Sequence, residues 1–517
     1  MNDAMIDGPD RSPQPNAGSD ALLAYGWRFW AAVLVTGVGA GLGAGLLMKL
    51  LHLAQSLAWG EGSGDFLDAV MRADPWRRVG VLLAAGAVVG ATRLLLRLRG
   101  SGHGGALDEA LWFHAGHLPV FRTLLNAVTS IVIVGMGASL GREAAPKQTG
   151  AVLGSALGRW IGLSPTQRRL LVACGAGGGI AAVYNVPIGA ALFAMEVLLG
   201  SLSLSLAPPA LAATALATAT AWLLLPDRAT YDVPSYPSSP ALLAGALVLG
   251  PLAGLAAAGY VKLICWADAK KPSGWAVAAA PVLVFGLLGA ASTWMPQLLG
   301  NGKDTVQAAF TDQGLSTLFL LVFVIGKPLA TAACLGAGAP GGLFTPTITT
   351  GAALGLLFGH IVALIAPDTV PPAIFAIVGA GAVLAATTQG PLSALVLLAE
   401  LTWRIDPVLV AIGLAIPGAL LVARRLDARS VYAGRIHIGR AKAEPDATVI
   451  SSAAHVREAL EAFLEGKAVC LTVVDESGQT LGLLRPDDVR AARSRCAPFD
   501  IATVRDLLPD QSGKASV

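Results

Sequence analysis

Apolar residues occur in long runs that contain no charged side chain. The clearest of these runs are Leu170–Met195, Val197–Pro226, Pro272–Gly302, Pro328–Pro367 and Thr369–Ala399. A helix needs about 20 apolar residues to cross a hydrocarbon core of about 30 Å, and several of the runs are longer than that. The pattern therefore predicts an all-α, polytopic membrane protein.

Other apolar segments do not match the length of one membrane crossing. The run Gln148–Gly158 is too short, and Pro328–Pro367 is too long. Glycine and proline interrupt many of these segments. Backbone that ends at membrane depth is tolerated only where it is buried in protein or lines a water-filled cavity. We therefore expect broken helices around an internal site.

Composition supports a membrane protein and excludes several other classes. Of the 517 residues, 54% are hydrophobic and 13% charged, whereas ordinary globular proteins have about 25% charged residues. This composition argues against a soluble enzyme, a nucleic-acid-binding protein and a secreted disulfide scaffold. The net charge of +3 is too small to indicate a polyanionic partner, and the five cysteines show no metal-ligand spacing. We expect no cofactor.

The change in composition along the chain predicts four parts. Residues 1–24 are polar and are expected to form a disordered tail. Residues 25–230 and 231–435 are expected to be two membrane repeats. The composition becomes polar after an arginine-rich segment, so residues 436–517 are expected to form a small cytoplasmic α/β domain and tail.

The two membrane parts repeat each other. Corresponding segments share their glycine spacing, a proline and a glutamate. The pairs at an offset of 201 or 204 residues are Gly150–Gly158 with Gly351–Gly359, Cys174–Ala182 with Val378–Ala386, Pro187 with Pro391, and Glu196 with Glu400. Membrane helices rich in glycine and alanine look alike, but the paired prolines and acids are not a matter of composition. Duplicated halves with broken helices are typical of transporters, whose substrate sites lie between the repeats. The sequence leaves open whether the repeats are parallel or inverted.

The offset of 201 also aligns two short loops that precede glycine-rich helices. Gly141–Ala145 aligns with Gly342–Pro346. A helix N-terminus presents unpaired N–H groups and the positive end of the helix dipole. Two such ends that meet inside the membrane would bind a negatively charged ligand, so the repeat predicts an anion as substrate.

Glu143 is the acid that this arrangement singles out. It follows Arg142, at the end of an uncharged stretch that starts at Thr123. A carboxylate in such surroundings is a candidate for function by default, and it would compete with an anion for the same N–H groups. A structural pair between Arg142 and Glu143 at a helix cap is the alternative.

Four motifs occur in an order that resembles a known family. Gly100–Gly102 (GSG) comes first, Gly141–Glu143 (GRE) second, Gly338–Pro346 (GAPGGLFTP) third and Asp427–Tyr432 last. Within a duplicated membrane protein, these strings resemble the CLC family of chloride channels and transporters. The resemblance covers roughly residues 25–435.

This resemblance implies a set of chloride contacts. Ser101 and Tyr432 would each supply a hydroxyl group, and Leu343 and Phe344 would offer backbone N–H groups. Glu143 would be the gating glutamate. The family also implies a CLC-type fold, chloride transport in place of an enzymatic activity, and a homodimer embedded in a lipid bilayer. We expect a multi-pass protein of a bacterial inner membrane.

The chain departs from the family pattern at several positions. His103 and Gly104 stand where Ile-Pro is usual, and Ala144 replaces a glycine. The proline of the second motif comes one residue late, at Pro146, and Lys147 follows it. Lys147 could raise the local positive potential or extend toward solvent.

A further departure concerns proton coupling. Exchangers of the family usually carry a second acid at the position of Val197. Its absence favours passive conduction. Glu196 is adjacent, so a proton pathway through Glu143 and Glu196, and hence chloride/proton exchange, remains the alternative.

The sequence also contains weaker signals for a serine-hydrolase nucleophile and for a histidine metal site. Gly137–Gly141 fits the G-x-S-x-G pattern of serine hydrolases, with Ser139 as nucleophile, but that motif needs a strand–turn–helix context. An intramembrane hydrolase is therefore a remote alternative. His114 and His117 could share a helix face, although no ligand triplet surrounds them, and His360 is expected to make local contacts only.

The C-terminal part resembles a single CBS motif. A helix is expected at Val456–Leu464 and strands at Val469–Val474 and Thr480–Leu484. Arg485 and Asp488 occupy the positions where the motif usually has Ser/Thr and Asp. Arg485 in place of Ser/Thr and the presence of one motif only argue against adenine-nucleotide binding, which is the alternative. A structural or dimer-stabilising tail is the favoured interpretation.

Overall fold

The computed structural model describes most of the membrane part and some of the C-terminal part. The described ranges are 25–60, 65–99, 107–237, 239–367, 369–404, 408–433, 449–459, 471–475, 479–484 and 503–507. The N-terminal tail and the CBS-motif positions Arg485 and Asp488 lie outside them.

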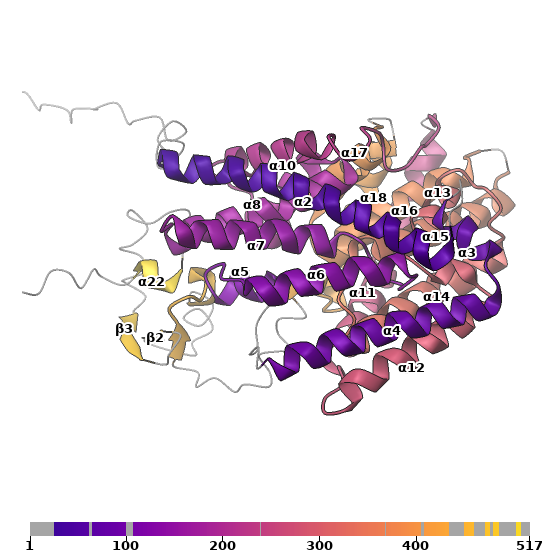
Figure 1. The fold of residues 1–517 in the computed structure, drawn as a ribbon. Helices are drawn as coiled ribbons and strands as arrows, with labels where there is room; N and C mark the ends of the chain where they lie inside the picture. The colour runs from indigo at the N-terminus through magenta and orange to yellow at the C-terminus, as the bar shows by residue number, and fades with distance from the viewer. Residues whose placement is uncertain are drawn as a thin grey trace, which may run out of the picture.

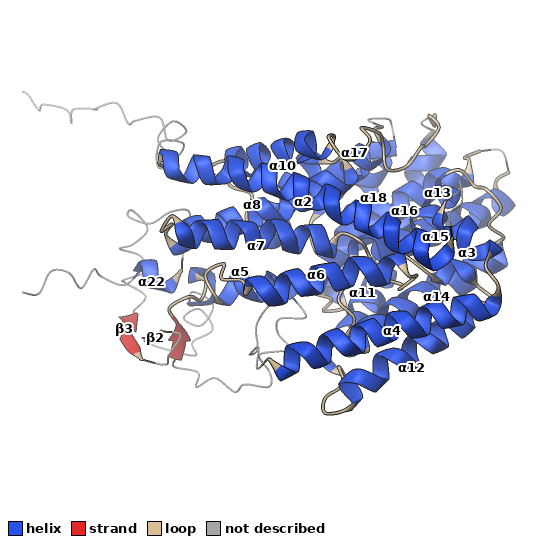
Figure 2. Ribbon diagram, in the orientation of Figure 1, coloured by secondary structure: helices blue, strands red, loops and turns tan. Residues whose placement is uncertain are grey.

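The membrane part consists of helices (Figures 1 and 2). Those of the first half are α2 (Trp27–Trp59), α3 (Phe66–Arg72), α4 (Pro75–Leu98), α5 (Leu107–Phe113), α6 (Val120–Gly135), α7 (Ala144–Trp160), α8 (Pro165–Tyr184), α9 (Pro187–Phe193) with a π-helical turn (Ala194–Leu198), and α10 (Ala207–Ala221). Those of the second half are α11 (Pro240–Ala269), α12 (Ala276–Ala291), a 3-10 turn (Pro296–Leu298), α13 (Lys303–Phe310), α14 (Thr317–Gly336), α15 (Phe344–Ile365), α16 (Pro372–Thr388), α17 (Pro391–Thr402) and α18 (Val408–Arg425).

The helix lengths confirm the prediction of a polytopic membrane protein. Within the described ranges, six helices are long and apolar enough to cross a membrane, namely α2, α4, α11, α14, α15 and α18. Five shorter apolar segments accompany them, among them α6, α12, α16 and α17. Helices of both kinds are expected where some stop partway through the bilayer.

The two predicted repeats are also present, because corresponding helices end in the same way. α8 ends at Tyr184 and is capped by Asn185, which has φ 58°, and α16 ends at Thr388 and is capped by Gln389, which has φ 57°. Both capping residues adopt the left-handed conformation that terminates a helix. Two residues further on in each repeat, Pro187 starts α9 and Pro391 starts α17, since proline fits the first position of a helix.

The shared glycines bring helix backbones into contact. A Cβ added to Gly150 on α7 would overlap the carbonyl of Gly175 on α8, and one added to Gly351 on α15 would meet the carbonyl of Gly379 on α16 at 2.6 Å. Small residues allow such close packing of helices within a membrane. The repeated glycine spacing therefore encodes the same helix pair twice.

The contacts between the repeats show how the halves are related. Gly141 N donates to Gly342 O over 2.7 Å, and Gly342 N donates to Gly141 O over 2.9 Å. Such reciprocal bonds between equivalent residues are those of a two-fold axis. From this meeting point α7 runs toward the end of the molecule that carries the C-terminal strands, and α15 lies toward the opposite end (Figure 1). The repeats are thus inverted, a question that the sequence left open.

A small sheet forms the described core of the C-terminal part (Figure 2). Its strands are β1 (Val449–Ser451), β2 (Leu471–Val474) and β3 (Thr480–Leu484), in the order β1-β2-β3, with β1 parallel and β3 antiparallel to β2. This confirms the predicted pair of strands and adds β1. The last described helix is α22 (Val504–Leu507).

The C-terminal part contacts the membrane part directly. The guanidinium of Arg169, on α8, is buried and donates from Nη2 to Ala453 O over 2.5 Å. The rings of Trp112 and His455 lie 5.3 Å apart. We call the end of the molecule that carries this sheet the inner end.

Candidate anion-binding site

The paired loops place two helix N-termini at one point inside the membrane part. α7 begins at Ala144 and α15 begins at Phe344, immediately after the bridge between Gly141 and Gly342. The N-terminal ends of both helices therefore face each other across the repeat axis. Each supplies unpaired N–H groups and the positive end of a dipole.

The carboxylate of Glu143 lies on this N-terminal end of α15. The side chain is 2% exposed. Its Oε1 accepts a hydrogen bond from Phe344 N over 2.8 Å. Its Oε2 accepts bonds from Tyr184 Oη over 3.1 Å and from Thr345 Oγ1 over 3.3 Å. A buried negative charge with these donors occupies the position that an incoming anion would need.

Leu343, the other residue predicted to offer a backbone N–H, does not contact Glu143 among the described hydrogen bonds. Leu343 is buried and is the N-cap of α15. Within the described part of the chain its N–H donates to no other residue, whereas its carbonyl accepts from Thr347. Phe344 therefore carries the observed contact with Glu143, and the N–H of Leu343 is an additional donor at the same helix end.

Two partners of Glu143, Tyr184 and Thr345, were not predicted. Tyr184 ends α8, and its hydroxyl bonds both Glu143 and Thr345, the latter over 2.6 Å. The guanidinium of Arg142 lies 5.2 Å from the centre of the Tyr184 ring. Arg142 thus contacts an aromatic ring and forms no ion pair with Glu143 among the described contacts, so the alternative of a structural Arg142–Glu143 pair gains no support.

Tyr432 lies near the site, within a group of aromatic rings. Its ring is 5.8 Å from that of Phe193, and the Phe193 ring is 6.5 Å from that of Phe344. The ammonium of Lys147 lies 4.6 Å from the centre of the Tyr432 ring. The last predicted chloride ligand is therefore close to the start of α15. Ser101, the first predicted ligand, lies outside the described residues, as do His103 and Gly104.

Two cavities reach Tyr432 from the inner end. One has a volume of about 330 Å³ and is lined by the Gly338–Leu343 loop and by Lys147. The other has a volume of about 630 Å³, and Glu196, Val197 and Arg424 contribute to its wall. Tyr432 lines both. The candidate site is thus accessible to water from the inner end.

Positive charge also lies on the outer approach. Lys303 begins α13, outside the long membrane-crossing helices. Burial lowers the pKa of Lys303, and the charge of Arg142 lowers this pKa further. The charges of Asp304 and Asp65 raise the same pKa, so this approach carries acidic groups beside its two cations.

Glu196, the second acid of the predicted proton pathway, caps a helix start. Glu196 accepts bonds from Leu392 N and Ser393 N at the start of α17 over 3.2 and 2.7 Å. Its repeat equivalent, Glu400, accepts bonds from Ile188 N and Gly189 N at the start of α9 over 3.0 and 2.6 Å. The two carboxylates thus cap helices of the opposite repeat. Neither contacts Glu143 among the described hydrogen bonds.

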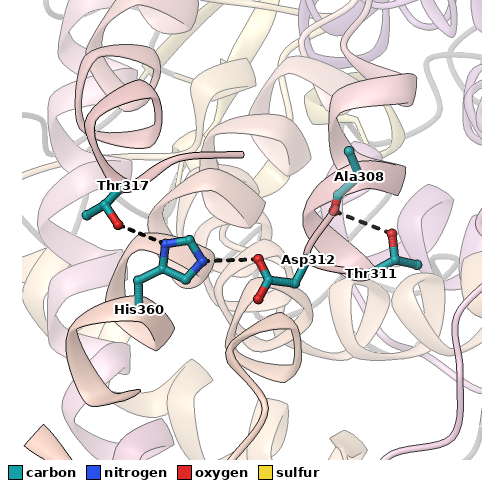
Figure 3. A network of polar contacts seen from close by, with 5 residues as sticks. All are labelled: Ala308, Thr311, Asp312, Thr317 and His360. Atoms are coloured by element: carbon teal, nitrogen blue, oxygen red, sulfur yellow. Dashed lines mark hydrogen bonds and ion pairs between the residues drawn. The ribbon is translucent and has the colours of Figure 1, made fainter. Parts of the chain in front are cut away.

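The remaining candidates make none of the described hydrogen bonds with Glu143. Ser139 follows a helix and not a strand, and its hydroxyl has no hydrogen-bond partner in the described part of the chain. His360 makes the expected local contacts: its ring bonds Thr317 Oγ1 over 3.1 Å and Asp312 Oδ1 over 3.0 Å (Figure 3). Within the described ranges, no group of three or more potential ligands, and thus none with His114, could hold a metal ion.

Inverted repeats with two helix N-termini at a buried carboxylate define a membrane permeation protein of the broken-helix class. Residues 87–424 match the family described as voltage gated chloride channel. The chain therefore belongs to the CLC family, as its motifs predicted, and is an integral, multi-pass membrane protein.

Several relatives and solved structures are similar to the chain. It is 34% identical over 394 residues to the ClcB-like chloride channel protein of Ralstonia nicotianae, covering 74% of this chain and 90% of that protein. It is 30% identical to the voltage-gated ClC-type chloride channel ClcB of Escherichia coli strain K12, covering 78% of this chain and 98% of that one.

The fold is similar to that of two solved antiporters. A slow cyanobacterial Cl⁻/H⁺ antiporter matches with a TM-score of 0.70 at 23% identity, over 82% of this chain and all of the other. A CLC-type fluoride/proton antiporter matches with a TM-score of 0.63 at 20% identity, over 79% of this chain and 97% of the other. These likenesses concern the fold alone.

Proposed function

We propose that the protein transports chloride across the membrane through a CLC-type pathway that passes the N-terminal ends of α7 and α15. The position of the Glu143 carboxylate carries this proposal: it accepts Phe344 N–H and two hydroxyl groups inside the membrane part. Donors that hold a carboxylate there would hold a chloride ion in its absence. Glu143 is then the gate, which opens when its side chain is protonated or swings aside.

The ligands of the central chloride are neutral. Ser101 and Tyr432 supply hydroxyl groups, and Leu343 and Phe344 supply N–H groups. Neutral donors and dipoles bind a monovalent anion without trapping it, as conduction requires. The names of the bacterial relatives, chloride channels in both cases, support chloride as the ion.

The hydroxyl of Tyr432 is expected to contribute to chloride affinity. In Tyr432→Phe, chloride binding measured by isothermal titration should weaken by about 1.5–3 kcal/mol, the usual contribution of a hydrogen bond to a charged ligand. Ser101→Ala should behave alike. Tyr236→Phe is the matched control, because its hydroxyl donates to Phe310 O, away from the site. Unchanged affinity in both Ser101→Ala and Tyr432→Phe would mean that the central site lies elsewhere.

We further propose passive conduction in place of chloride/proton exchange. Proton transfer needs a titratable group or a chain of water molecules from the inner end to Glu143. Val197 lines the inner cavity where exchangers of the family carry an acid, and it cannot hold a proton. Both oxygens of the adjacent Glu196 accept backbone N–H groups of α17, which fixes that carboxylate at the repeat interface.

Passive conduction predicts that a chloride gradient does not drive protons uphill. In liposomes that contain the protein, an imposed chloride gradient should not move protons against their own electrochemical gradient, as measured by the internal pH. Val197→Glu should introduce measurable proton movement, and Val183→Glu, on α8, serves as its control. Stoichiometric proton pumping by the wild-type protein would establish exchange instead.

Assembly and location follow from the same proposal. We propose a homodimer in a bacterial inner membrane, as the resemblance to the family implies, acting as a transport protein and not as an enzyme. Both bacterial relatives support that location. For the C-terminal part we favour a structural or dimer-stabilising role over adenine-nucleotide binding.

A further inference from the structure

Basic and aromatic side chains gather where α4, α11 and α12 meet near the inner end. α4 ends at Leu98, toward the end of the molecule that carries the sheet (Figure 1). The loop between α11 and α12 lies beside this helix end, because Arg97 Nη1 donates to Gly274 O over 2.6 Å. Both α4 and α11 are long and apolar enough to cross a membrane. This corner of the molecule therefore lies where the inner leaflet meets water.

One face of α11 carries a lysine on each side of an exposed tryptophan. Lys262, Trp266 and Lys270 recur at intervals of four residues, which places them on the same face of a helix. All three are exposed. The ammonium of Lys270 lies 4.5 Å from the centre of the Trp266 ring. Exposed lysine and tryptophan side chains at a helix end are typical of the membrane–water boundary.

The loop after α11 brings a second tryptophan to this corner. Trp275 is 83% exposed and directly precedes α12, whose N-terminal end adds the positive pole of a helix dipole. The loop is fastened to α4, since Arg93 Nη2 donates to Pro272 O over 3.3 Å and Arg97 donates to Gly274 O. The cations of α4 and α11 thus belong to one fixed surface. We call it the basic corner, and its residues are Arg97, Lys262, Trp266, Lys270 and Trp275.

The positive charge of the basic corner is not paired with acids among the described residues. None of its three cations takes part in the described ion pairs. The nearby Asp268 instead pairs with Lys271 over 2.6 Å. None of the residues of the basic corner lines either of the two inner cavities. The basic corner is therefore a separate surface from the anion pathway.

Apolar surface adjoins these cations on α4. Leu94, Leu95 and Leu98 are 45%, 40% and 76% exposed. Leu94 and Leu98 are four residues apart and so share one face of the helix. Exposed leucines on a membrane-crossing helix contact acyl chains. Cations beside such leucines match a ligand that has both a phosphate group and acyl chains, and the exposed tryptophans suit the boundary between the two.

We propose that the basic corner binds the headgroup of an anionic phospholipid of the inner leaflet. Its phosphate lies against the cations, and its acyl chains lie along the exposed leucines of α4. Basic surfaces between membrane helices on the cytoplasmic side bind such headgroups. The proposal needs no assumption about which ion the protein transports.

Native mass spectrometry of the purified protein tests the site. Dioleoyl phosphatidylglycerol should bind about tenfold more tightly than dioleoyl phosphatidylcholine, which has the same acyl chains and no net charge. In Lys262→Gln/Lys270→Gln, the dissociation constant for phosphatidylglycerol should rise about twentyfold, because each basic side chain near an anionic lipid contributes roughly fivefold. Neither lysine makes a described hydrogen bond, so the variant should fold. Arg97→Gln should weaken binding in the same direction.

Arg28→Gln is the matched control. Arg28 also lies over an exposed tryptophan, with its guanidinium 5.8 Å from the centre of the Trp27 ring. This pair belongs to the start of α2, which lies well apart from the end of α4 (Figure 1). Its loss should leave the affinity for phosphatidylglycerol within about twofold of wild type, since one exposed cation adds only general attraction.

Three results would overturn the proposal. One is equal binding of the two lipids by the wild-type protein, and another is wild-type affinity in Lys262→Gln/Lys270→Gln. The third is displacement of the lipid by an equimolar amount of glycerol phosphate, which would identify a site for a soluble phosphate. Each of these outcomes leaves the transport proposal untouched.

Discussion

Glu143→Gln is expected to raise chloride flux through the reconstituted protein at neutral pH by about tenfold and to remove most of its pH dependence. In the wild-type protein the carboxylate accepts Phe344 N–H and the hydroxyls of Tyr184 and Thr345. A hydrogen bond to a charged group contributes about 1.5–3 kcal/mol, and about 1.4 kcal/mol corresponds to a tenfold change in an equilibrium. A neutral amide competes less well with chloride for these donors.

The sign of the wild-type pH dependence follows from the same contacts. Acid protonates the carboxylate and weakens its hold on the helix end, so wild-type flux should increase as the pH falls. The glutamine variant should be nearly flat over the same range. Glu400→Gln is the matched control: that carboxylate also accepts backbone N–H groups at a helix start but lies at α9. A wild-type pH profile in Glu143→Gln would contradict the gating role.

Gly342→Ala is expected to reduce chloride flux close to background while the protein still folds. An added Cβ at Gly342 would overlap Oε1 of Glu143, which is the position proposed for the anion. The φ of Gly342 is not in the left-handed region, so an alanine there suffers no backbone strain. Flux from liposomes, with gel filtration as the check on folding, measures the effect.

A double variant separates two reasons for such a loss. In Glu143→Ala/Gly342→Ala the carboxylate is gone, so a clash with the carboxylate alone would be relieved. We expect flux to remain low because the methyl group still fills the anion position. Gly413→Ala is the control, since an added Cβ there meets no atom within 4 Å. Full recovery in the double variant would place the anion elsewhere.

Much of the fold could be predicted from the sequence because the repeat is written in residues with strong physical meaning. The offset of 201 residues aligned Gly141 with Gly342 and Glu143 with Phe344, and the structure joins both pairs by hydrogen bonds. Glycines that allow helix contact and prolines that start helices recur for the same reason. Charge-free runs likewise indicated the membrane part.

Other features depend on three-dimensional relations that one sequence does not contain. The inversion of the repeats appears only in the folded chain, where α7 and α15 run toward opposite ends and Glu196 and Glu400 each bond the opposite repeat. Tyr184 ends an apolar helix, and nothing in its neighbourhood in the sequence marks it as a partner of Glu143. Thr345 lies within the recognised GAPGGLFTP string, but its hydroxyl contact with Glu143 requires the two loops to meet.

The central claim is that an anion binds at the N-terminal end of α15 once the Glu143 carboxylate no longer occupies it. The most direct measurement is a crystal structure of Glu143→Gln in bromide, with anomalous scattering to locate the ion. The account predicts a bromide peak within hydrogen-bonding distance of Phe344 N–H, next to Gly342. An ordered helix end without a bromide peak at saturating bromide would contradict it.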